Sequence, residues 1–524
     1  MFRSLGPEHE TFYEELNWVF RDRCILKKTD SYRQHPSSTL LNATMASEEE
    51  KRTGYTAGSV SSSSNTDLEQ APPPRLPDEK DAIPEADETM TLDSKREGLM
   101  VNPFENDANG ETEYRTLTWL NAGFLLVAET ISLGILSLPA VVASMGFVPG
   151  VILIIFFGVL TTYTGYVTYQ VKIAFPGIHN FADAGLFFFG RWAKEVSEAA
   201  QIILLVFIMS AHILTFSIMM NVLTNHGTCT IVFTVVGMVV SMILCIPRTM
   251  KNVALMSIAS CLSIATAIFI AMIGIGVDPP AGAHAYAVTP SSQTSFRTGV
   301  VAVANILVSF CSNIAYFGFI SEMRQPRDFP KALAMLQTCT CSLYIVVAVV
   351  IYRFAGTDVK SPAIGSASPI IRKVAYGIAI PTIVVAGVIY AHVATKNVYV
   401  RIWRKTNVMN EKSFRSLGSW YGLTILLWVV AWVIANAIPV FSQLLGLLGS
   451  LFCTWFSMIL PAAWWIMMNK KQLTMNWKKT ALTIINVTIA LIGLVLCGLG
   501  VWGSAVDISQ NSGSASAFSC GDNS

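Results

Sequence analysis

From residue 115 onward, long apolar runs alternate with short polar connections. About eleven such runs lie near 117–142, 147–171, 196–224, 230–246, 252–277, 299–322, 332–354, 374–400, 418–438, 441–468 and 480–503. Most exceed the ~20 apolar residues that a helix needs to cross the hydrocarbon core of a membrane. Strand-like alternation is missing from these runs, and backbone groups in lipid need hydrogen-bond partners within their own segment. The pattern therefore predicts an all-α polytopic membrane protein.

Three segments of different character follow from this pattern. Residues 1–114 lack apolar periodicity and contain a serine run at Ser61–Ser64 and a proline run at Pro72–Pro74, which predicts a disordered tail. Its composition identifies no regulatory partner. Residues 115–503 form the predicted transmembrane domain, and residues 504–524 form a short carboxyl-terminal tail.

The positive charges lie mainly in every second loop. Arg248, Arg401 and Lys470 belong to the richer set of loops, whereas Arg297 and Arg353 belong to the poorer set. The positive-inside rule places the richer set in the cytoplasm, together with the amino-terminal tail. An odd number of spans then places the carboxyl-terminal tail outside, so both Cys229 and Cys520 are external and could form a disulfide in an oxidising compartment.

The composition excludes several classes of function. Only 13% of the residues are charged, against about 25% in soluble domains. The formal net charge of +2 argues neither for nor against nucleic acid, and no nucleic-acid partner is expected for a membrane-embedded chain. The other cysteines form no CxxC pair or Cys/His cluster, so no metal site is expected. Catalytic motifs such as HExxH, GxSxG and the Walker lysine motif are missing, which argues against an enzyme, a bound cofactor and ATP-driven transport.

The first span contains the most informative segment, Ala128–Pro139, with the sequence AETISLGILSLP. Pro139 cannot donate a backbone hydrogen bond to the carbonyl of Ile135, and Gly134 loosens the same turn. We therefore expect a broken helix, which is tolerated at membrane depth only where it lines a cavity or is buried in protein. The alternative is a simple proline kink whose hydroxyls bond back to the chain.

The sixth span repeats this interruption with the small and polar residues of Ser309–Gly318. Broken segments at corresponding positions of two halves indicate the binding site of a transporter. The predicted substrate-binding residues are Glu129, Thr130, Ile131, Ser132, Leu133, Gly134, Phe310, Cys311, Ser312 and Asn313.

Such a site suits a zwitterion. Amides free at a half-helix starting near Gly134 would favour a carboxylate, and carbonyls free near Glu129–Ile131 would accept from an ammonium group. Phe310 and Tyr316, with apolar residues of spans three and eight, would surround the side chain. Because no arginine or second acid lies centrally in the spans, we expect neutral amino acids as substrates.

Three residues are candidates for proton coupling: Glu129, His212 and His392. Acids within spans are functional candidates by default, and an ionised carboxylate there costs at least ~2.5 kcal/mol. Structural, hydrogen-bonded roles remain open for both histidines. Lys396 is expected to snorkel to the cytoplasmic surface and Glu322 to lie at a helix end, where it could join an inner gate. The proton gradient is the expected driving force, with sodium left open.

The sequence resembles the amino acid/auxin permease family over residues 115–503, and among its branches the fungal neutral amino-acid permeases. The resemblance lies in Glu129–Pro139, in Phe310–Pro326 with its SEMRQP ending, and in the segment from Ile438 to Pro461. It implies a leucine-transporter-like fold of two inverted five-helix repeats plus one helix, and proton-coupled uptake with substrate contacts at both breaks. Many relatives have an asparagine or a glycine-rich sequence where Glu129–Gly134 stands here, so the family's ion ligands are not carried over.

The predicted function is secondary transport of neutral amino acids across the plasma membrane, with membrane lipid as the surrounding partner. One alternative is a vacuolar exporter that works by proton antiport. Another is an amino-acid sensor that binds without transporting and signals through the tail. A channel fits less well, since a central carboxylate between broken helices favours alternating access over a continuous pore.

Overall fold

The computed structural model describes residues 115–523 except for positions 249, 281–285, 291–294, 404–405, 407, 409–412, 439 and 512–516. The predicted disorder of the amino-terminal tail lies outside the described residues. The helices are α4 (Trp119–Met145), α5 (Phe147–Ala174), α6 (Phe181–Phe189), α7 (Arg191–Thr224), α8 (Thr230–Leu244), α9 (Met250–Val277), α10 (Phe296–Ser309), α11 (Asn313–Glu322), α12 (Phe329–Ala355), α13 (Pro369–Trp403), α14 (Phe414–Ala437), α15 (Phe441–Leu448), α16 (Leu460–Met468) and α17 (Trp477–Asn511). Three short 3₁₀ turns occur at Pro326–Asp328, Gly356–Asp358 and Ala363–Ser366, and π-helical turns at Gly449–Cys453 and Trp455–Ile459 join α15 to α16.

Each predicted span coincides with a helix or a group of helices, and the all-α polytopic class is confirmed. Ten segments of the described chain are long and apolar enough to cross a membrane, while α8, with 15 residues, falls short of spanning length. Helix length alone therefore does not confirm the predicted count of eleven. The sequence analysis missed α6, whose start is marked by Asn180 accepting a hydrogen bond from the amide of Asp183.

The helix contacts of the first five spans recur among the next five. Each span is matched with the span five places later or earlier. The contacts of α4 with α12 and with α9 then correspond to those of α11 with α5 and of α10 with α15. The contact of α7 with α14 corresponds to that of α13 with α8. With α8 counted as a span, an offset of five spans is odd, so the second set crosses the membrane in the opposite direction. This is the arrangement of two inverted five-span repeats, with α17 as the additional final helix.

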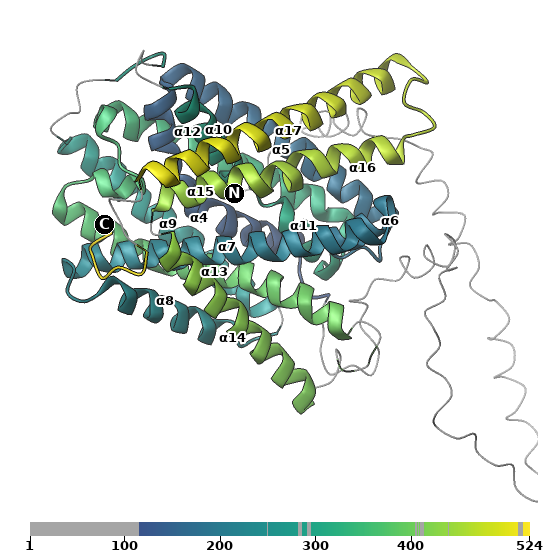
Figure 1. Ribbon diagram of the computed structural model, residues 1–524, viewed down its shortest axis with the longest axis horizontal. Coiled ribbons are helices and arrows are strands. Elements are labelled where there is room, and N and C mark those ends of the chain that lie inside the picture. Colours follow the sequence, from purple (N-terminus) through teal and green to yellow (C-terminus); the bar gives the residue numbers. More distant parts are fainter. Residues whose placement is uncertain are drawn as a thin grey trace, which may run out of the picture. The chain divides into compact units, whose positions relative to one another are not determined.

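Burial separates a core from a surrounding layer. The apolar window of α4 is 94% buried, whereas that of α17 is only 22% buried because its other faces are free to contact lipid. In Figure 1, α17 runs along the upper edge of the bundle and α14 along its lower edge, with α4 and α7 between them. The residues predicted to carry chemistry thus lie on the helices that protein surrounds most completely.

A disulfide joins Cys229, directly before α8, to Cys520 in the carboxyl-terminal tail. This confirms the pairing that the sequence left possible. The tail is also fastened by hydrogen bonds, since the hydroxyl of Thr230 donates to the carbonyl of Gly521 at 2.7 Å. Asn523 contributes further contacts, with its side-chain amide donating to Ser217 of α7 at 3.0 Å. The described end of the chain is therefore fastened near the carboxyl-terminal end of α7 and the amino-terminal end of α8.

Candidate substrate site

A small cavity lies where the helices of the core meet. It has a volume of about 20 Å³, which is room for little more than one water molecule. Its lining comes from α4, α7, α10 with the residues after it, α13 and α15, and consists of Glu129, Thr130, Leu133, Gly134, Ile208, His212, Val308, Cys311, Tyr390, Leu445 and Leu448. The cavity therefore lies between the first, third, sixth, eighth and tenth spans.

Glu129 is the one acidic residue of this lining. Its side chain is only 2% exposed, and neither carboxylate oxygen has a hydrogen-bond partner among the described residues. A buried polar group without a partner is costly, and more so if it is charged. The carboxylate is thus available for a proton or for a cationic group that enters the cavity.

The first span is not broken, contrary to the prediction from its sequence. α4 is helical without interruption from Trp119 to Met145, with Pro139 inside it. Its hydroxyls bond back to the helix: Thr130 donates to the carbonyl of Leu126 at 2.7 Å, and Ser137 donates to that of Gly134 at 3.0 Å. These bonds absorb the polar groups that suggested a break, so no half-helix begins at Gly134.

The sixth span is interrupted, as predicted. α10 ends at Ser309 and α11 begins at Asn313, with a non-helical turn between them. Cys311 from this turn lines the cavity, whereas the other predicted residues of the sixth span lie outside it. Ser312 is hydrogen-bonded to the hydroxyl of Tyr316 at 2.8 Å, and the side-chain amide of Asn313 donates to Thr164 of α5 at 3.2 Å.

Of the remaining residues predicted to bind substrate, three line the cavity and three are buried outside its lining. Thr130, Leu133 and Gly134 line the cavity with Glu129. Ile131 and Ser132 are buried but lie outside the lining, as does Phe310.

The two histidines have different surroundings. Nδ1 of His212 lies 2.8 Å from the carbonyl of Ile208, to which it can only donate, and Nε2 lies 3.1 Å from the hydroxyl of Ser132. Ser132 in turn lies 3.0 Å from the carbonyl of Glu129, so a chain of polar groups joins His212 to the backbone of the acid. His392 does not line the cavity; its ring is buried beside Trp420, with centroids 5.4 Å apart, and neither ring nitrogen has a hydrogen-bond partner within the described residues.

Sequence reasoning assigned apolar lining to spans three and eight without naming residues, and it missed the contribution of the tenth span. Tyr390, Leu445 and Leu448 line the cavity from α13 and α15. The i, i+3 spacing of the two leucines places them on one helix face, but many leucines in the spans share such spacing. No signal in the sequence separated these residues from ordinary core positions.

Ion pairs hold one end of the core, the end that the positive-inside rule predicts to be cytoplasmic, and one of these pairs is fully buried. Lys396 of α13 lies 2.5 Å from the carboxylate of Glu322 at the end of α11, and both side chains are buried. The expectation that Lys396 snorkels to the surface is therefore wrong, because a buried carboxylate lies within its reach. Arg401 pairs with Glu195 at 2.8 Å and also with Glu198, whose side chain is buried.

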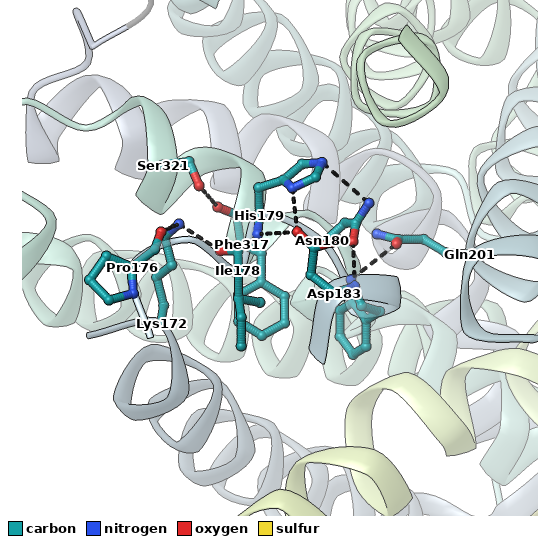
Figure 2. Close-up of polar contacts among 10 residues, drawn as sticks. Lys172, Pro176, Ile178, His179, Asn180, Asp183, Gln201, Phe317 and Ser321 are labelled. Atoms are coloured by element: carbon teal, nitrogen blue, oxygen red, sulfur yellow. Dashed lines mark hydrogen bonds and ion pairs between the residues drawn. The ribbon is translucent and has the colours of Figure 1, made fainter. Parts of the chain in front are cut away.

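A polar cluster in the connection between α5 and α6 lies against the same end of the core (Figure 2). His179 and Asp183 form a buried pair at 2.6 Å. Gln201 of α7 accepts a hydrogen bond from the amide of Phe181 and donates one to the carbonyl of Ile314 at 3.0 Å. Gln201 thus links the loop helix α6 to α11, close to the interruption of the sixth span.

The sequence of this chain is similar to those of known membrane transport proteins. Residues 115–506 match the family described as transmembrane amino acid transporter protein. The "N amino acid transport system protein" of Neurospora crassa is 34% identical over 406 residues, which is 76% of this chain and 86% of the relative. A "transmembrane transporter" of Gibberella moniliformis is 31% identical, covering 80% of this chain and 90% of the relative.

More distant similarities extend beyond fungi. The "amino acid transporter AVT1E" of Arabidopsis thaliana is 24% identical over 72% of this chain and 70% of the relative. Among solved structures, the nucleobase-cation-symport-1 family transporter Mhp1, in a closed conformation with bromovinylhydantoin bound, is similar with a TM-score of 0.49 and 15% identity, covering 80% of this chain and 98% of that one. On the strength of the family match and the fungal relatives, the chain belongs to the transmembrane amino acid transporter family.

Proposed function

We propose that this member of the family is a secondary active transporter that takes up neutral amino acids together with protons. The observation that supports this most directly is the carboxylate of Glu129, buried without a partner in a cavity between the inverted repeats. Secondary transporters bind substrate near the middle of the membrane at such a repeat interface. The printed name of the Neurospora crassa relative, an amino acid transport system protein, agrees with this proposal.

The lining favours amino acids without a charged side chain. Glu129 can accept from the substrate ammonium group. Cys311 of the lining lies two residues before α11, whose amino-terminal end favours the substrate carboxylate. The other lining residues are mainly apolar, and none of them is a lysine or arginine. A second charge on the substrate would therefore lose its hydration without gaining a partner.

Proton coupling is assigned to the carboxylate of Glu129, with His212 of the same lining as the second candidate. A carboxylate in the membrane interior is costly when ionised, so a substrate ammonium beside Glu129 changes how readily it holds a proton. Such mutual dependence between two binding events is the coupling that joins their fluxes. The proton gradient then supplies the driving force, and no cofactor is required.

The size of the cavity supports alternating access. The closed core has room for little more than one water molecule, which is too small for an amino acid. The core must therefore widen to admit substrate, and the buried ion pair of Lys396 with Glu322 must part to release it on the predicted cytoplasmic side. We place the protein in the plasma membrane, with the vacuolar membrane as the alternative.

The test is competition of radiolabelled amino-acid uptake by each of the twenty amino acids. It is run at two external pH values, with and without sodium. We expect neutral amino acids to compete, lysine and glutamate to compete poorly, and uptake to rise at acidic external pH. Uptake that is inhibited equally by lysine would contradict the assigned lining. Binding without flux would identify a sensor, and efflux from vacuoles would identify the antiport alternative.

A further inference from the structure

Tyr344 of α12 connects the two spans that form the centre of the site. Its side chain is fully buried, and its hydroxyl lies 2.7 Å from the backbone carbonyl of Thr130 in α4 and 2.9 Å from that of Ser309 in α10. Both oxygens are acceptors, so the single hydroxyl proton is shared between them or alternates from one to the other. One side chain of the seventh span thus joins the backbones of the first and sixth.

The carbonyl of Ser309 belongs to the last residue of α10, where a helix leaves its final carbonyls unsatisfied. In transporters with interrupted spans, free carbonyls at such half-helix ends commonly coordinate the coupling sodium ion. Here a hydrogen-bond donor already lies against this carbonyl. The carbonyl oxygens of Thr130 and Ser309 therefore both face a hydroxyl group, at a position where a cation could otherwise bridge them.

The space around the hydroxyl is filled. A Cβ atom built on Gly134 would lie 2.4 Å from the Tyr344 oxygen and 2.8 Å from Cβ of Ser309. The hydroxyls of Ser137 and Ser309 lie 3.4 Å apart in the same region, and each donates to a carbonyl of its own helix. The absence of a side chain at Gly134 is what lets the three spans approach this closely.

We propose that the Tyr344 hydroxyl replaces a coupling cation at this junction, so that the first and sixth spans keep their alignment without a bound sodium ion. The inference rests on the proposed transport function, and it assigns the choice of proton over sodium to a particular side chain. Tyr344 lies outside the cavity lining, so it acts as a positioning residue and not as a substrate contact.

The test compares Tyr344→Phe with the matched control Tyr352→Phe. Tyr352 lies in the same helix and is fully buried, but its hydroxyl bonds to the backbone of Ala287, outside the helical core. Uptake is measured per molecule at the cell surface, in sodium, potassium and choline buffers of equal pH. We expect Tyr344→Phe to lower the maximal rate at least tenfold with less than a threefold change in KM, and Tyr352→Phe to stay within threefold of the parent in both.

A second measurement does not depend on transport. The melting temperature of the purified full chain is recorded in sodium chloride and in choline chloride, and we expect no sodium-specific shift. Sodium-specific stabilisation, sodium-dependent uptake by the parent protein, or equal kinetics of the two variants would overturn the inference. Absence of any amino-acid uptake by the parent would refute the proposed function, while the melting measurement would still test the cation replacement.

Discussion

Gly134 offers the sharpest test of the packing around the site, through substitution by alanine. The added Cβ would lie 2.4 Å from the Tyr344 hydroxyl oxygen, 2.8 Å from Cβ of Ser309 and 2.9 Å from the Tyr344 ring. All three distances are shorter than real Cβ contacts, and the obstructing groups are a buried tyrosine and a helix end. Overpacking of this kind costs about 1–3 kcal/mol.

The size of the functional effect follows from that cost. If the closed arrangement of the core is destabilised by about 2 kcal/mol relative to its open forms, its population falls by roughly thirtyfold, at 1.4 kcal/mol for each factor of ten. We therefore expect Gly134→Ala to reduce the uptake rate by about ten- to a hundredfold, and Gly134→Val to abolish uptake. The proposed mechanism requires passage through the closed arrangement, which is why its population limits the rate.

Gly318→Ala is the matched control for this substitution. Gly318 lies in α11, and a Cβ atom there meets nothing within 4 Å. Alanine in a helix is more favourable than glycine by about 0.5–1 kcal/mol, so this variant should be as stable as the parent or slightly more so. Uptake per surface molecule and melting temperature are compared for both variants. Equal behaviour of Gly134→Ala and Gly318→Ala would refute the close approach of the three spans.

Three further predictions address the acid, the inner ion pair and the topology. Glu129→Gln keeps the shape of the side chain but cannot titrate, so we expect it to lose pH-driven accumulation while retaining counterflow exchange; accumulation with the parental pH dependence would remove Glu129 as the coupling residue. Lys396→Met deprives the buried Glu322 carboxylate of its ammonium partner and should lower stability by about 3–5 kcal/mol. Adding Glu322→Gln should restore part of that loss, and a simple sum of the two single effects would count against direct pairing. Cys520→Ser should make the partner thiol reactive toward a membrane-impermeant maleimide added outside intact cells, where an amino-terminal epitope tag stays protected. Labelling only after permeabilisation would place the carboxyl-terminal tail on the cytoplasmic side.

Much of the fold could be predicted from the sequence because helices that cross a membrane need long apolar runs separated by polar connections. Apolar runs of spanning length located every long helix, and the interruption at Ser309–Gly318 located the break of the sixth span. The disulfide was foreseeable because Cys229 and Cys520 were the two cysteines assigned to the outer side. These predictions depended on local composition and on alternation across the membrane.

The site was less predictable because its details depend on tertiary contacts. Pro139 and the hydroxyls of α4 suggested a break, but the hydroxyls bond to their own helix and the helix continues. Lys396 looked like a surface lysine until Glu322, 74 residues away, supplied a buried partner. Tyr344 carried no sign of its role, because nothing in the sequence indicates which two carbonyls a buried tyrosine will reach.

The contacts of α11 indicate which part of the site moves when substrate is released under the proposed mechanism. α4 is one continuous helix, whereas α11 is separated from α10 by a non-helical turn that can act as a hinge. α11 is fastened at its last residue by the ion pair of Glu322 with Lys396, and near its first residue by the bond from Gln201 to Ile314. Leu117 adds a third attachment, since its amide donates to the carbonyl of Glu322 and its carbonyl accepts from Arg324. Because all three attachments converge on one short helix, inward opening requires their release together. The segment just before the first span therefore belongs to the inner gate, and the energy of releasing α11 sets the barrier that substrate and proton binding must jointly lower.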